Sequence, residues 1–125
     1  MLKGKYIGVY FSASWCGPCR AFTPELIKFR NEHRDKFEVV LVGGDGSPKE
    51  QAKYVKKYGM PWYAMINQCK EAKHASETLQ VEFIPYLVIL DPSGKVVSKN
   101  GVSELRTWKS GAINRWVDKS LKDPA

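Results

Sequence analysis

The segment Val9–Cys19 reads VYFSASWCGPC: an apolar run passes through a short turn into two cysteines that are separated by two residues. Residues 5–11 are rich in β-branched and aromatic side chains and predict a first strand. An apolar stripe then predicts a helix from about Cys19 to His33, with a kink at Pro24 because proline lacks an amide hydrogen. The cysteine pair is therefore expected where a strand leads into a helix.

Cysteines in this position have the geometry that disulfide exchange needs. One thiolate attacks and a second thiol resolves the mixed disulfide, and this spacing in a first helical turn brings two sulfurs within bonding range. Cys16 would face solvent beside unpaired backbone amides and the positive end of the helix dipole, which favour a thiolate. We therefore assign Cys16 as the nucleophile and Cys19 as the resolving thiol. Pro18 would stiffen the loop, and Gly17 would let a partner's backbone approach.

A zinc half-site is the alternative interpretation of the cysteine pair, and it requires two further ligands at suitable spacing. The remaining candidates in the chain are Cys69, His74 and His33. They would have to reach the start of another helix, so we expect no metal. We interpret Cys69 as an incidental thiol, with regulatory oxidation as the alternative, and both histidines as surface residues.

The rest of the chain alternates strand and helix signals. Residues 37–42 are nearly all apolar and predict a buried strand, and a helix should begin at the N-cap Ser47 and stop at Gly59. Further along we expect a helix over about 69–79, strands over 86–90 and 95–98 joined by a turn, and a C-terminal helix with an inner face of Ala112, Ile113, Trp116, Val117 and Leu121. The predicted fold class is α/β. One domain over residues 1–125 would hold a central mixed sheet, with a parallel core and a C-terminal antiparallel hairpin, flanked by helices.

Charge and composition narrow the classes of partner. The chain has 125 residues and a net charge of +7, and its densest basic stretch, Lys53, Lys56 and Lys57, has the spacing of a solvated helix face. No nucleic-acid motif accompanies these lysines and no apolar run spans a bilayer, so we expect neither nucleic acid nor membrane as a partner. A positive field can still recruit acidic partners. With no signal-peptide pattern at the N-terminus, we expect a cytoplasmic or nuclear monomer.

Residues 9–24, the motif Met60-Pro61-Trp62 and the segment Val81-Glu82-Phe83-Ile84-Pro85 together resemble the tryparedoxin and nucleoredoxin branch of the thioredoxin superfamily. The resemblance covers nearly the whole chain and implies a thioredoxin-like fold. It implies that Pro85 is a cis-proline facing the cysteine loop and that the Ile84–Pro85 backbone pairs with a substrate peptide. It also implies that Trp15 shields one side of the site and that Trp62 borders it or packs in the core. The substrate-binding residues carried over are Trp15, Gly17, Pro18, Ile84 and Pro85.

Three departures from the family pattern bear on the mechanism. Thioredoxins carry a buried aspartate on the strand before the motif, where this chain has Tyr10, as the tryparedoxin-like branch does. That branch usually has Cys-Pro-Pro-Cys, whereas Gly17 gives the thioredoxin-type loop. The tryptophan that tryparedoxins carry after the next strand is replaced in the run Val42-Gly43-Gly44-Asp45. Asp45 is a candidate proton relay or, alternatively, a turn residue before the next helix.

The main functional hypothesis is a protein-disulfide reductase that binds no cofactor. The resemblance implies electrons from an upstream dithiol, trypanothione in a tryparedoxin, or from a flavoprotein reductase in a nucleoredoxin or thioredoxin. It implies disulfide-containing protein substrates, with peroxiredoxins among them. The alternative is a redox-regulated binding module with little turnover, in which the cysteine pair only switches the affinity for a partner.

Overall fold

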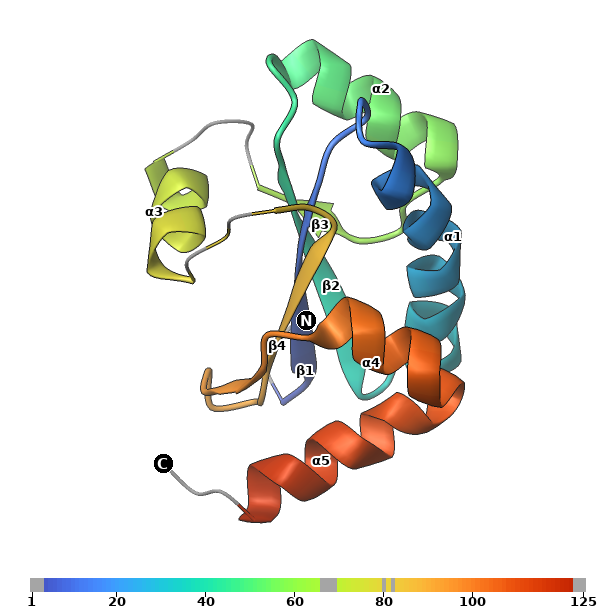
Figure 1. Cartoon of the computed structure of the whole chain (residues 1–125), viewed down its shortest axis with the longest axis vertical. Coiled ribbons are helices and arrows are strands. Elements are labelled where there is room, and N and C mark those ends of the chain that lie inside the picture. The colour runs from blue at the N-terminus through green and yellow to red at the C-terminus, as the bar shows by residue number, and fades with distance from the viewer. Residues whose placement is uncertain (1–3, 66–69, 80, 82, 123–125) are drawn as a thin grey trace.

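The computed structural model describes residues 4–65, 70–79, 81 and 83–122 (Figure 1). Cys69 lies outside the described residues, so its role stays a prediction. The elements in chain order are β1 (Tyr6–Ser12), α1 (Gly17–Glu32), β2 (Phe37–Gly43), α2 (Pro48–Tyr58), β3 (Tyr63–Ala64), α3 (Lys70–Thr78), β4 (Tyr86–Leu90), β5 (Val96–Ser98), α4 (Gly101–Trp108), the short helix η1 (Lys109–Gly111) and α5 (Ala112–Lys122). Among these helices, none has the length and apolar character to cross a membrane.

The strands form one mixed sheet in the order β3-β2-β1-β4-β5. The central strand β1 is parallel to β2 and antiparallel to β4, which pairs antiparallel with β5. The predicted fold class is confirmed. Of the two hairpin strands, only β5 is an edge strand, because β4 lies beside the central strand β1. Ser12 therefore lies next to Gly43, and Tyr86 lies opposite Phe11. The ends of β1 and β2 and the start of β4 meet at one edge of the sheet, where the cysteine loop follows β1.

Alternate residues of the strands pack into two cores, as the period of two in a strand dictates. Tyr10, Leu87 and Ile89 belong to the larger core, which α1, α2, α4 and α5 cover, whereas Val9 and Val88 face α3. Figure 1 shows α3 on one side of the sheet, with α1, α2 and α4 on the other. The larger core anchors the helix that carries both cysteines through its buried residues Phe22, Leu26 and Phe29.

Helix ends follow the capping signals where these exist. In α2, the Ser47 hydroxyl accepts an amide hydrogen bond of 3.2 Å, and Gly59 ends the helix in the left-handed conformation at φ +62°. α1 begins at Gly17, two residues earlier than predicted, with Cys16 as its N-cap. It continues as one helix through Pro24.

The C-terminal region differs from the prediction of one helix, because α4 precedes α5. The side chain of the N-cap residue Asn100 makes no capping hydrogen bond. α4 ends at a break where Lys109 has φ 52°. A Cβ atom added at Gly101 would lie 2.7 Å from the Leu87 Cγ atom and 2.8 Å from the Leu87 carbonyl oxygen. Glycine therefore allows α4 to begin in close contact with β4.

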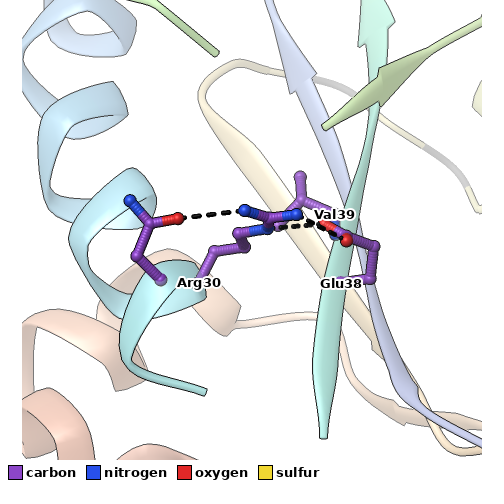
Figure 2. Close-up of polar contacts among 4 residues, drawn as sticks. Arg30, Glu38 and Val39 are labelled. Atoms are coloured by element: carbon purple, nitrogen blue, oxygen red, sulfur yellow. Dashed lines mark hydrogen bonds and ion pairs between the residues drawn. The ribbon is translucent and has the colours of Figure 1, made fainter. Parts of the chain in front are cut away.

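An ion pair ties the last turn of α1 to β2. Arg30 Nε and Nη2 donate to the two carboxylate oxygens of Glu38 at 2.9 Å each, and Glu38 Oε1 also accepts the Val39 amide at 2.9 Å (Figure 2). Burial raises the pKa of Glu38, but hydrogen bonds from Arg30 and Val39 outweigh it, so the pKa of this carboxyl lies below its usual value. The hydrogen bonds to Glu38 raise the pKa of Arg30. The pair thus holds α1 on the sheet at the end of the helix remote from the cysteines.

Candidate active site

The two cysteines occupy the start of α1 and form a disulfide with their Cα atoms 5.2 Å apart. Cys16 is the N-cap of the helix, and its Sγ accepts a hydrogen bond of 3.3 Å from the Cys19 amide. Pro18 lies within the first two helical positions, where a proline loses no helical hydrogen bond. When the pair is reduced, the same amide and the helix dipole stabilise a thiolate on Cys16. The predicted pairing of the two sulfurs is confirmed.

Access distinguishes the two sulfurs less strongly than we expected from the sequence. Cys16 is 6% exposed and Cys19 is 0% exposed. Cys16 was expected to face solvent, but it is nearly buried, and the Ile84 carbonyl oxygen lies in contact with its sulfur. Cys16 is still the more exposed of the two residues, in agreement with its assignment as the nucleophile.

The segment before β4 covers the cysteine loop, as the family resemblance implied. The Ile84–Pro85 peptide bond is cis, which confirms that expectation. The Ile84 carbonyl oxygen lies 3.9 Å from Cys16 Sγ. In the disulfide the sulfur has no hydrogen to donate, so this is a contact, whereas the Cys16 thiol can donate across it. The antiparallel register of β4 and β1 brings Pro85, remote in sequence, to the cysteines.

The turn before Cys16 is held by Asp45, which is fully buried after β2. Its Oδ1 accepts from the Ser14 amide at 3.0 Å and from the Ser14 hydroxyl at 2.6 Å. Trp15 is 64% exposed, and its indole Nε1 donates to the Gly44 carbonyl at 3.3 Å. Asp45 therefore lies beside the site and fixes the loop that presents Trp15. Its predicted role as a proton relay stays a prediction, and its role in the turn is supported by these contacts.

A group of buried hydroxyls beneath Cys19 was missed in the sequence. Tyr10 OH and Thr23 Oγ1 donate to the Cys19 carbonyl at 3.1 and 2.9 Å and lie 2.8 Å from each other. Tyr54 OH lies 3.1 Å from Thr23 Oγ1 and 2.7 Å from Ser12 Oγ. Five close contacts thus share four hydroxyl hydrogens. With Tyr10 and Thr23 both donating to the Cys19 carbonyl, Tyr54 donates to Thr23 and Ser12 donates to Tyr54, so that every hydroxyl hydrogen is used.

Burial raises the pKa of Tyr10 well above the ordinary value of a phenol. The hydroxyl therefore stays protonated and remains a donor throughout the neutral range. Tyr10 occupies the position where thioredoxins have an aspartate. In this chain its neutral hydroxyl donates a hydrogen bond to the Cys19 carbonyl. One signal for this network was available in the sequence, since Thr23 follows Cys19 by one helical turn.

The structure decides between the two alternatives for Trp62 and corrects the expectation for His33. Trp62 is buried in the larger core, with its ring edge-on to Tyr10 at 6.2 Å, so it packs beneath the network and does not border the opening. His33 is half-buried against Phe29, at 4.6 Å between ring centroids, whereas His74 is exposed as expected. His33 follows the 16-residue helix α1, which puts it about 24 Å from Cys16 along the axis. Within the described ranges, no three His, Cys, Asp or Glu side chains cluster as metal ligands.

A hollow of about 440 Å³ lies beside the cysteine loop. Pro18, Ile84 and Pro85 form its wall on the side of the cysteines. Phe83, which is largely exposed, and Val102 add apolar surface, and α4 closes the far side. Four residues predicted to contact substrate, Trp15, Pro18, Ile84 and Pro85, therefore lie around the redox pair, and Gly17 is exposed between the two cysteines. Their contact with substrate stays a prediction.

Comparison with known proteins identifies the family. A family model described as thioredoxin-like matches residues 4–96. The chain belongs to the thioredoxin superfamily. Two relatives place it in the tryparedoxin and nucleoredoxin branch. It is 43% identical over 114 residues, 89% of the chain, to a probable nucleoredoxin 1 of Arabidopsis thaliana, of whose length it spans 19%. It is 35% identical over 119 residues to tryparedoxin of Trypanosoma brucei brucei, covering 92% of this chain and 81% of that one.

A solved structure, tryparedoxin II complexed with glutathionylspermidine, is 35% identical and superposes with a TM-score of 0.80, over 88% of this chain and 78% of that chain. Gly44 lies beside the Trp15 ring. A Cβ atom there would meet Ala13 at 3.6 Å and the Trp15 ring at 4.0 Å, so a side chain would fit in ordinary contact. Without one, the Trp15 indole rests on backbone. The chain is thus a member of a thioredoxin-like oxidoreductase family with a Cys16–Cys19 pair.

Proposed function

We propose that this chain reduces disulfides in protein substrates through a dithiol–disulfide cycle of Cys16 and Cys19. The observation that carries the proposal is the placement of the pair. Cys16 is the N-cap of α1, and its Sγ accepts a hydrogen bond from the Cys19 amide. Cys19 is buried, and the cis peptide bond before Pro85 lies next to the cysteine loop. This arrangement favours a thiolate on the more accessible sulfur and keeps the second sulfur within reach of the first.

The cycle begins with attack of the Cys16 thiolate on one sulfur of the substrate disulfide. A bond from Cys16 to that sulfur forms, the substrate S–S bond breaks, and the departing thiolate takes a proton from solvent. Cys19 then loses its thiol proton and attacks the Cys16 sulfur, which releases the second substrate thiolate for protonation. The substrate gains two electrons and two protons, and the protein is left with the Cys16–Cys19 disulfide.

The chain's own residues assist each step. The Cys19 amide donates to Cys16 Sγ and so stabilises negative charge there. Tyr10 and Thr23 hold the Cys19 carbonyl, which limits movement of the resolving thiol's backbone. The hollow beside Pro85 has the size and apolar wall that an extended peptide needs next to its disulfide.

The reductant and substrate follow by analogy with the branch. Because tryparedoxin II was obtained in complex with glutathionylspermidine, we propose small thiols of this chemical class, in dithiol form, as reductants, and a flavoprotein reductase as the alternative. We propose disulfide-containing proteins, peroxiredoxins among them, as substrates. A reducing compartment, the cytoplasm or nucleus, would keep the pair in its active dithiol state.

The test uses the Cys69→Ser background so that the third thiol makes no adduct. Dithiothreitol-driven insulin reduction is compared for this background, Cys16→Ser and Cys19→Ser. We expect activity in the background and loss of at least a hundredfold in Cys16→Ser. Cys19→Ser should accumulate a mixed disulfide with substrate, seen as a mass adduct that reducing agent removes.

Equal inactivity of the background and both variants would refute catalysis of general disulfide reduction. Redox-dependent binding of a partner without turnover would then identify the binding-module alternative. An adduct formed by Cys16→Ser but not by Cys19→Ser would reverse the assigned roles of the two cysteines.

A further inference from the structure

Two hollows flank the redox pair, and basic side chains line both. The Pro85 hollow, of about 440 Å³, contains Lys99 and Arg106 beside Pro18 and Ile84. The Ser14 hollow, of about 240 Å³, lies between the cysteine loop and α2 and is lined by Ser14, Tyr54, Arg20, Lys53, Lys57 and Glu50. Each hollow therefore has two net positive charges, and each shares a wall with the loop that carries Cys16.

Two other hollows carry less excess charge. The hollow between α1 and the end of α4 holds Lys28 and Lys109 together with Glu25 and Glu32, so its charges balance. The hollow near Trp62 holds Lys5 and the paired residues Arg30 and Glu38. The linings of these two hollows are therefore less positive than those of the two hollows beside the cysteine loop.

Three of these exposed cations make contacts within the protein. Arg20 Nη1 donates to the Ser14 carbonyl at 2.7 Å. The Lys57 ammonium lies 5.9 Å from the centroid of the Tyr58 ring. Arg106 lies 5.3 Å from the Phe22 ring centroid and forms an ion pair of 3.3 Å with the exposed Glu25, which lines the hollow between α1 and the end of α4. Restrained cations lose less side-chain entropy when an anion binds.

We propose that the redox face docks an acidic protein substrate, whose carboxylates on either side of the target disulfide enter the Ser14 and Pro85 hollows. This inference rests on the proposed reductase function and names the class of its substrate. Opposite charge on a face speeds diffusional encounter, and two separated basic hollows orient the substrate so that its disulfide lies over Cys16. The apolar wall between them accommodates the residues next to the disulfide.

The experiment uses pre-reduced protein in the Cys69→Ser background and two synthetic peptides with the same disulfide loop. One peptide has Glu on both sides of the loop, and the other has Gln. Second-order rate constants for peptide reduction are measured by acid quench, without added reductant. We expect the Glu peptide to react about tenfold faster than the Gln peptide at low ionic strength, with the ratio falling towards one as salt is added.

Charge variants locate the effect. Lys53→Glu/Lys57→Glu and, separately, Lys99→Glu should bring the Glu-to-Gln ratio to about one or below, and Lys53→Gln/Lys57→Gln should give an intermediate ratio. The matched control for the double variant is Lys36→Glu/Lys119→Glu. It changes the net charge as much as Lys53→Glu/Lys57→Glu does, at exposed positions before β2 and on α5. It should retain most of the preference.

The outcomes separate this inference from the function on which it rests. If the background fails to reduce the Gln peptide, the proposed function is wrong. If it reduces both peptides equally well, the function stands and the acidic-substrate inference is overturned. An equal loss of preference in the control and in Lys53→Glu/Lys57→Glu would also overturn it, because net charge alone would then explain the effect.

Discussion

Replacing Glu38 by Gln tests how the end of α1 remote from the redox pair is held on the sheet. The substitution keeps the shape of the side chain and removes its charge. The side chains of Arg30 and Glu38 are 15% and 9% exposed, and two hydrogen bonds of 2.9 Å join them. Exposed pairs contribute about 0–1 kcal/mol, and breaking a fully buried pair costs about 3–5 kcal/mol. For this mostly buried pair we expect Glu38→Gln to lower the free energy of unfolding by about 2 kcal/mol at pH 7.

The effect should depend on pH with a definite sign. The pKa of Glu38 is lower in the folded protein than its usual value of about 4.3. A carboxyl with a depressed folded pKa contributes stability above its unfolded pKa, and this contribution is lost as the pH falls through the folded pKa. The wild type then carries a neutral Glu38 that closely resembles Gln. The difference between wild type and variant should therefore shrink towards zero in acid.

Urea denaturation of the reduced proteins, at pH 7 and at intervals down to pH 3, measures this difference. The matched control is Glu25→Gln, which breaks the exposed pair with Arg106 at 3.3 Å and should change stability by less than about 0.5 kcal/mol. A Glu38→Gln effect that is constant from pH 7 to pH 3, or no larger than that of Glu25→Gln, would refute the assigned role of the ion pair.

Three further changes test other contacts in the fold and site. Thr23→Val removes three of the five close contacts in the hydroxyl network and Tyr10→Phe only two, so we expect losses of about 2 and 1 kcal/mol by urea denaturation, and the reverse order would contradict the network. Gly101→Ala places a Cβ atom 2.7 Å from the Leu87 side chain and should lower the free energy of unfolding by about 2–3 kcal/mol. Adding Leu87→Ala should restore this stability only in part, because the Leu87 carbonyl oxygen is almost as close, and full restoration would argue against the backbone clash. Asp45→Ala removes two hydrogen bonds from the loop before the cysteines, and hydrogen exchange of the Ser14 amide should speed up at least tenfold. Unchanged exchange of this amide would show that the turn keeps its structure without Asp45.

The parts of the site that were predictable depend on residues close together in the sequence. The spacing of Cys16 and Cys19 fixes their geometry once a helix begins there, and the Ser47 and Gly59 signals determine both ends of α2. The position of Pro85 was of another kind. No local pattern places it at the cysteines, and the family resemblance supplied that expectation, which the register of β4 on β1 explains.

The parts that were missed involve contacts between distant segments. Ser12 and Tyr54 are 42 residues apart, and nothing near either residue indicates that their hydroxyls meet beneath Cys19. Glu38 looked like an interruption in an apolar strand, and only the packing of α1 on β2 reveals its partner Arg30. α4 was overlooked because its first residue, Gly101, is a poor helix former.

The hydroxyl network also bears on how the resolving step is arranged. A carboxylate beneath Cys19 would change its charge with pH and would be able to accept a proton directly. Tyr10 does neither, because burial raises its pKa and its hydroxyl already donates to the Cys19 carbonyl or to Thr23. A neutral, fully hydrogen-bonded layer avoids the cost of a buried charge under an apolar helix. The position beneath Cys19 therefore holds the backbone of this cysteine in place, and in the proposed cycle the proton that Cys19 releases would go to another acceptor or to solvent.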